Sequence, residues 1–144
     1  MKPIHILLVE DSEGDIMLTT DAFEDARIAN TVSVTRDGEE AIHFLQQTGP
    51  HANAERPDLI LLDINMPRKN GHEVLQFIKS DAHFKTIPVI MLTTSSSPND
   101  IYNSYSEYAN AYITKPIDIK DFFKVITTIE SFWLQIAQLP GPAH

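Results

Sequence analysis

Short aliphatic runs alternate along the chain with longer segments of mixed polarity, and this alternation predicts strands and helices in turn. The runs that predict strands lie at residues 4–9, 32–35, 59–62, 89–92 and 111–113. The third and the fourth run are almost purely aliphatic, which is typical of strands that helices cover on both faces. Each of these two runs ends at a polar residue, Asp63 or Thr93.

The segments between the aliphatic runs carry apolar residues at helical spacing. They predict helices at residues 12–25, 39–47, 72–80, 99–108 and 119–138, and an exposed loop without periodicity at 49–57. Parallel neighbouring strands need crossover connections, so five strands alternating with five helices predict an α/β domain with a parallel sheet between two helical layers. We expect one domain over residues 1–139 and a frayed tail at 140–144.

Composition narrows the classes of function. The chain has 144 residues, which suits one domain, and 20 acidic against 11 basic residues give a net charge of −9. Such a charge opposes binding to nucleic acids and anionic membranes, so we expect neither as a partner. The absence of cysteine excludes disulfides, thiolate metal sites and a cysteine nucleophile. Without a signal-peptide pattern or a spanning apolar stretch, the sequence predicts a cytoplasmic protein.

Polar residues at the predicted strand ends indicate a site. In open α/β sheets ligands bind outside the carboxyl ends of the strands. Glu10 and Asp11 follow the first strand, Asp63 the third, Thr93 the fourth and Lys115 the fifth. Three adjacent carboxylates repel one another unless a cation neutralises them, and a hard divalent ion with oxygen ligands, Mg²⁺ above all, suits them.

The same residues suit phosphoryl transfer, in which charge spreads over the oxygens of the transferred group. Asp63 would be the nucleophile and would form an acyl phosphate. Mg²⁺ on Asp11 and Asp63, helped by Glu10 through water, would hold one phosphoryl oxygen. Thr93 and Lys115 would hold the others with a hydroxyl and an ammonium group.

These motifs, in this order, resemble the receiver domain of two-component response regulators over about residues 4–135. The resemblance is carried by Glu10-Asp11, by Asp63-Ile64-Asn65-Met66-Pro67 with Gly71, by Thr93 and by Lys115-Pro116. It implies a doubly wound, flavodoxin-like fold with strand order 2-1-3-4-5. It also implies that Asp63 accepts phosphate from a histidine kinase, and that this switches the surface of the fourth helix, fifth strand and fifth helix. The carbonyl of Asn65 would complete the metal site.

The resemblance assigns further roles and shows one departure. Thr93 and Tyr112 match the family's switch pair, and the bond before Pro116 matches one that the family holds in cis. The family usually has Ala or Gly where Thr94 stands here. A β-branched side chain at this position could narrow the access to the phosphate and change the rates of phosphorylation and dephosphorylation.

Two other functions compete with a phosphorylation switch. A Mg²⁺-dependent phosphatase of the haloacid dehalogenase type also uses an Asp nucleophile at a strand end, but it needs a second Asp two residues later as general acid and base, where Asn65 stands. A binding scaffold that is never phosphorylated would not need Asp63, Thr93 and Lys115. We therefore expect a protein that catalyses only its own phosphorylation and dephosphorylation, and that signals without an attached output domain.

The predicted last helix has an apolar arc of roughly 220°, against about 100° for a stripe that faces only a sheet. The excess predicts a homodimer interface at Phe123, Phe132, Trp133 and Leu134, unless a longer helix simply covers the sheet. The loop at 47–57 and the Phe132-Trp133-Leu134 ending resemble a subgroup of stand-alone regulators that serve bacterial phytochrome kinases. This resemblance makes a phytochrome the expected kinase.

Overall fold

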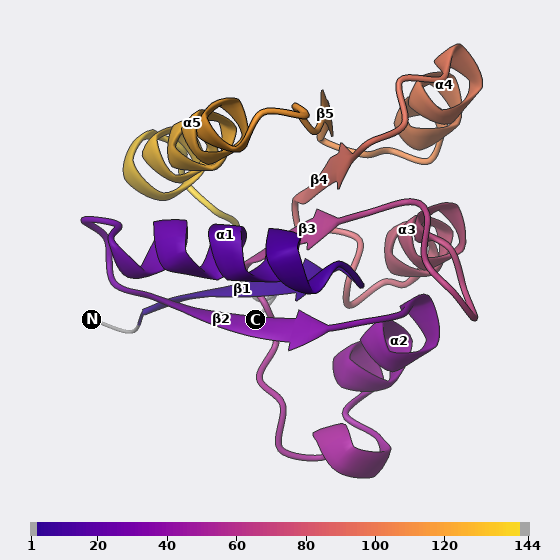
Figure 1. Cartoon of the computed structure of the whole chain (residues 1–144). Coiled ribbons are helices and arrows are strands. Elements are labelled where there is room, and N and C mark those ends of the chain that lie inside the picture. The colour runs from indigo at the N-terminus through magenta and orange to yellow at the C-terminus, as the bar shows by residue number, and fades with distance from the viewer. Residues whose placement is uncertain (1–2, 142–144) are drawn as a thin grey trace.

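A parallel sheet of five strands forms the centre of the molecule in the computed structural model, which describes residues 3–141. Figure 1 shows the strands with helices on both sides. The spatial order is β2-β1-β3-β4-β5, which confirms the predicted α/β fold and strand order. The strands are β1 (Ile4–Val9), β2 (Asn30–Thr35), β3 (Leu59–Leu62), β4 (Val89–Thr93) and β5 (Ala111–Thr114).

Two apolar clusters join the helices to the two faces of the sheet. One cluster joins α2 and α3 to one face, and the other joins α1 and α5 to the opposite face. All four residues of β3 and all five of β4 are buried, as their aliphatic sequence predicts. The helices are α1 (Glu13–Glu24), α2 (Gly38–Gln46), α3 (Gly71–Ser80), α4 (Pro98–Ser106) and α5 (Ile119–Ile129).

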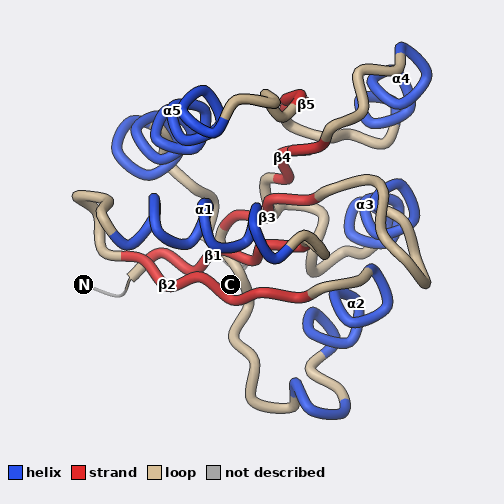
Figure 2. Tube along the Cα trace, in the orientation of Figure 1, coloured by secondary structure: helices blue, strands red, loops and turns tan. Residues whose placement is uncertain are grey.

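Helix α4 is held less firmly than the other helices. Its one buried residue is Ser104, whereas each of the other four α-helices buries at least three. It lies beside β5 and α3 at one end of the sheet, as Figure 2 shows. Few buried apolar contacts make an element easier to displace.

The chain after α5 differs from the prediction. The expected single helix over 119–138 ends at Ile129, and a π-helical segment, η2 (Glu130–Ile136), follows it. A π-helix places residues five positions apart on one face, and Ile129 and Leu134 are accordingly both buried, with 3% and 6% of their surface exposed. The prediction that Leu134 faces outward is therefore wrong, because it assumed regular α-helical spacing.

Two smaller features complete the chain. The expected loop at 49–57 contains one short 3₁₀ turn, η1 (Gly49–His51). Within residues 3–141, no helix has the length and apolar character needed to cross a membrane.

Candidate functional site

Parallel pairing brings the predicted site residues to one edge of the sheet. The Asp63 amide donates to the Val9 carbonyl at 3.1 Å, and the Lys115 amide donates to the Thr93 carbonyl at 2.7 Å. The carboxyl ends of β1, β3, β4 and β5 therefore lie next to one another, and the arrowheads of β3 and β4 in Figure 1 point to this edge. Residues as far apart as 10 and 115 meet here.

Three carboxylates form the acidic part of this site. Glu10 and Asp63 are buried, with 3% and 7% of their surface exposed, and Asp11 is exposed. One oxygen of each lies within 4.8 Å of the others, which suits a shared divalent cation. Asn65 is exposed in the turn that follows Asp63, and its role as a fourth ligand stays a prediction.

Lys115 supplies the positive charge. Its side chain is 4% exposed, and its ammonium group contacts Glu10 and lies 3.2 Å from Asp63 Oδ2. It also lies 3.0 Å from Asp15 Oδ2, a contact that sequence reasoning missed. The available signal was the position of Asp15 in the first turn of the helix that follows Glu10 and Asp11. Burial disfavours the charged amine, but the ion pairs outweigh it and raise the pKa of Lys115.

The two buried carboxyl groups differ in ionisation. Burial, together with the neighbouring Asp63, raises the pKa of Glu10 to about 8. Burial also acts on Asp63, but hydrogen bonds from Glu10 and Thr93 and the charge of Lys115 outweigh it and lower the pKa of Asp63. The group predicted to be the nucleophile is thus the one held as a carboxylate.

The two residues of the predicted switch pair, Thr93 and Tyr112, lie on the neighbouring strands β4 and β5. Thr93 is fully buried at the end of β4, and its hydroxyl is one of the groups that lower the pKa of Asp63. The ring of Tyr112 packs against the cluster under α2 and α3, and its hydroxyl donates to the Ser95 carbonyl at 2.8 Å. Thr94 is exposed, and its effect on the reaction rates stays a prediction.

The bond between Lys115 and Pro116 is trans, because no cis peptide bond occurs among residues 3–141. The predicted cis-proline is therefore wrong. The trans form is the lower in energy for a bond before proline, by about 0.5–1 kcal/mol. Lys115 reaches Glu10 and Asp63 with the bond in this form.

A tight loop between β3 and α3 holds Asp63 in place. The Gly71 amide donates to the Ile64 carbonyl at 2.8 Å, so the loop closes on itself directly beside the site. Asn70 and Glu73 then form a reciprocal capping box that starts α3. Asp63 is thus fixed by β3 on one side and by the start of α3 on the other.

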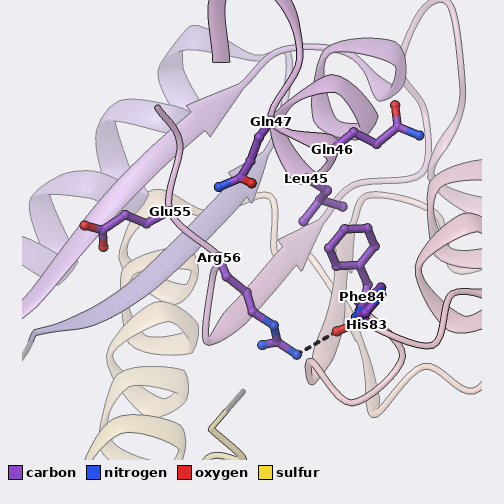
Figure 3. Close-up of a pocket in the computed structure, with 7 residues that line it drawn as sticks. All are labelled: Leu45, Gln46, Gln47, Glu55, Arg56, His83 and Phe84. Carbon is purple, nitrogen blue, oxygen red and sulfur yellow. Dashed lines mark hydrogen bonds between the residues drawn. The ribbon is translucent and has the colours of Figure 1, made fainter. Parts of the chain in front are cut away.

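A separate cavity of about 380 Å³ lies at the opposite edge of the sheet, between the segments that lead into β3 and β4. Figure 3 shows Arg56 and Phe84 in its wall. The Arg56 guanidinium donates to the His83 carbonyl at 2.9 Å and to the Thr86 hydroxyl at 3.1 Å. This cation therefore ties two loops together, far from the carboxylates.

Comparison with known proteins gives consistent matches. The profile of the response regulator receiver domain matches residues 6–127. Response regulator Rcp1 of Synechocystis sp. is 46% identical over 139 residues, which cover 96% of this chain and 95% of that protein.

Two solved structures superpose closely on the chain. The Mn²⁺-bound form of Rcp1 has a TM-score of 0.94 at 46% identity, over 96% of this chain and 100% of that one. The phosphorylated cyanobacterial phytochrome response regulator RcpA also has a TM-score of 0.94 at 46% identity, over 97% and 100% of the two chains. Both therefore share the fold over nearly their whole length.

Proposed function

The chain belongs to the response regulator receiver family, and we propose that it is a phosphorylation switch in which Asp63 takes the phosphoryl group from a partner histidine kinase. The observation that carries this proposal is the state of Asp63. It is a buried carboxylate whose pKa is lowered by Thr93 and Lys115 among other groups, it lies 3.2 Å from the Lys115 ammonium, and it lies beside Glu10 and Asp11. The family assignment gives no support to the phosphatase alternative, which Asn65 also opposes.

In the proposed reaction a carboxylate oxygen of Asp63 attacks the phosphorus of a phosphohistidine. A bond between oxygen and phosphorus forms, the bond between phosphorus and nitrogen breaks, and its electron pair stays on the imidazole. Lys115 and Thr93 donate hydrogen bonds to the phosphoryl oxygens as their negative charge is redistributed. The chain catalyses no other reaction in this proposal.

The carboxylates of Glu10, Asp11 and Asp63, with the carbonyl of Asn65, would hold a divalent cation, for which we propose Mg²⁺. The cation would neutralise the charge that builds up between the phosphoryl group and the acidic cluster. The grouping of three carboxylates within 4.8 Å supports this assignment, as does the Mn²⁺-bound form of the relative Rcp1. Mg²⁺ suits a site of few carboxylates because it keeps several waters.

We propose that Thr93 and Tyr112 transmit phosphorylation to the surface formed by α4, β5 and α5. The Thr93 hydroxyl acts on the pKa of Asp63 and accepts a hydrogen bond from the Ser95 amide in the loop before α4, and Tyr112 on β5 donates to the carbonyl of the same residue. The weak attachment of α4 makes it the element most easily moved. Exposed side chains for a partner are available on this surface at Tyr102, Ile117 and Ile119.

The test is incubation with acetyl phosphate and Mg²⁺, followed by intact mass spectrometry. We expect the protein to gain one phosphoryl group, and a chelator added beforehand to prevent the gain. A protein that gains nothing, or gains equally without a divalent cation, contradicts the proposal. Repeated turnover of small phosphate esters would instead support the phosphatase.

We further propose a phytochrome histidine kinase as the phosphate donor in the cytoplasm, because the relative RcpA is a phytochrome response regulator at 46% identity. Radiolabelled phosphate on a phytochrome kinase should pass to this protein faster than phosphate on an unrelated histidine kinase. Equal rates from both donors would remove the support for this partner. No nucleic acid or membrane takes part in the proposed signalling.

The apolar surface of α5 and η2 supports a homodimer. Phe123 and Phe132 are 39% and 50% exposed, and the rings of Phe132 and Trp133 are nearly perpendicular, with their centroids 5.5 Å apart. Phe132 and Trp133 line a hollow of about 370 Å³ together with Ile113 and Val125. Leu134 is buried within the subunit and takes no part in the proposed interface.

The dimer is tested by light scattering coupled to size-exclusion chromatography. We expect Phe132→Ser to shift the equilibrium to monomer by at least about tenfold, because one buried aromatic anchor contributes on the order of 2 kcal/mol. Met17→Ser is the matched control, since Met17 is 63% exposed on α1. A wild-type mass equal to one chain at all concentrations would contradict the dimer.

A further inference from the structure

A short series of hydrogen bonds ties the start of α3 to the loop between β4 and α4. His72, the second residue of α3, lies with its Nε2 2.9 Å from Oδ1 of Asp100 in the first turn of α4. The Ser95 hydroxyl donates to Oδ2 of the same carboxylate at 2.5 Å. Asp100 therefore uses both oxygens, one toward each neighbour. We refer to His72, Asp100 and Ser95 as the loop latch.

The main chain of Ser95 contacts both members of the proposed switch pair. Its amide donates to the Thr93 hydroxyl oxygen at 3.4 Å, and its carbonyl accepts from the Tyr112 hydroxyl at 2.8 Å. Ser95 thus binds Asp100 with its side chain and contacts Thr93 and Tyr112 with its backbone. In this arrangement the Thr93 hydroxyl lies close enough to Asp63 to lower the pKa of that carboxyl group.

Both hydrogen bonds of the latch are accepted by the Asp100 carboxylate. The Ser95 hydroxyl and His72 lower the pKa of Asp100, so the carboxylate is ionised and both bonds are charge-assisted. The other ring nitrogen of His72, Nδ1, is buried and has no partner within residues 3–141. Because an ionised carboxylate can only accept, Nε2 of His72 carries a proton and donates it to Asp100.

The latch also reaches the other side of the phosphoacceptor. His72 directly follows Gly71, whose amide closes the loop after Asp63. The Asp100 carboxylate therefore ties the loop that follows β3 to the loop that follows β4. Since α4 buries only Ser104, few other contacts hold the start of this helix.

We propose, on the basis of the proposed phosphorylation of Asp63, that His72, Asp100 and Ser95 are positioning residues that hold loop 94–97 ready to receive the phosphoryl group. With the latch intact, Thr93 faces Asp63 in most molecules before phosphate arrives. Without the latch, the loop samples other conformations, and fewer molecules are ready to bind a phosphoryl group. The apparent affinity for the phosphoryl group falls in proportion to the fraction of molecules that remains ready.

The experiment measures binding of beryllofluoride, a phosphoryl mimic, to the Mg²⁺-loaded protein by calorimetry. We expect Ser95→Ala and His72→Leu each to weaken beryllofluoride binding by about five- to tenfold, as the loss of one charge-assisted hydrogen bond would do. The Mg²⁺ affinity should change by less than about twofold, since neither residue belongs to the acidic cluster. Ser95→Thr keeps a hydroxyl and should restore binding.

Ser96→Ala is the matched control, because Ser96 is exposed in the same loop. Variants that bind beryllofluoride as tightly as the wild type overturn the latch and leave the proposed function standing. A loss in Ser95→Ala without one in His72→Leu also overturns it, because Ser95 would then act alone. A parallel loss of Mg²⁺ affinity overturns it too, since the acidic cluster would be damaged. A wild-type protein that binds no beryllofluoride overturns the proposed function and the latch together.

Discussion

Replacing Asp63 with Asn should abolish the gain of a phosphoryl group from acetyl phosphate in the presence of Mg²⁺. The amide has nearly the same shape as the carboxylate, but it lacks the negative charge and the nucleophilic oxygen that form an acyl phosphate. Loss of a nucleophile typically costs a factor on the order of 10³ or more in rate. Intact mass spectrometry over a time course measures the effect directly.

The matched control is Asp21→Asn, an exposed carboxylate on α1 outside the site. This variant should be phosphorylated at the wild-type rate, because it changes the net charge equally but touches no site residue. Thermal unfolding of both variants checks that the fold is kept. If Asp63→Asn still gains one phosphoryl group, another side chain is the acceptor, and the proposed role of Asp63 is wrong.

Replacing Gly71 with Ala should strongly destabilise the protein. A Cβ at this position would lie 2.2 Å from the Asp63 carbonyl oxygen and 2.7 Å from Ile64 Cα, so the backbone next to the phosphoacceptor would have to move. The hydrogen bond from the Gly71 amide to the Ile64 carbonyl would be strained or lost. We expect the free energy of unfolding to fall by about 3 kcal/mol or more, measured by urea denaturation.

Gly14→Ala is the matched control, since a Cβ there would meet nothing within 4 Å. Gly14 lies in the first turn of α1, where alanine should raise the stability by up to about 1 kcal/mol. Equal stability of Gly71→Ala and the wild type would show that the loop after Asp63 yields easily. The loop would then not orient the carboxylate, contrary to the role assigned to it.

The sequence predicted the sheet and the place of the site from strong local signals. The run at residues 59–62 is purely aliphatic, and its burial on both faces follows from that composition. Because parallel strands end at a common edge, Asp63, Thr93 and Lys115 had to come close once the strands were correctly placed. The roles assigned to them rest on the chemistry of these residue types.

The predictions that failed concern features that depend on the folded surroundings. Leu134 is buried because a π-helical segment shifts the register after Ile129, and helical periodicity alone contains no sign of that shift. The bond before Pro116 is trans, although the family resemblance implied cis. Neither the burial of Leu134 nor the isomer of the bond before Pro116 could be settled without the positions of the neighbouring elements.

The sequence by itself determined the fold class, the strand order through its family resemblance, and the set of polar residues at the carboxyl edge of the sheet. Alternation of apolar runs is a local property, and local properties can be read along a chain. Only the tertiary structure decided that Asp15 joins Glu10 and Asp63 around Lys115, and that His72, Asp100 and Ser95 tie two loops together. Asp15 and Lys115 are 100 positions apart in the chain, and His72 and Asp100 are 28 apart, so these contacts arise only when packing brings the helices and loops to fixed positions.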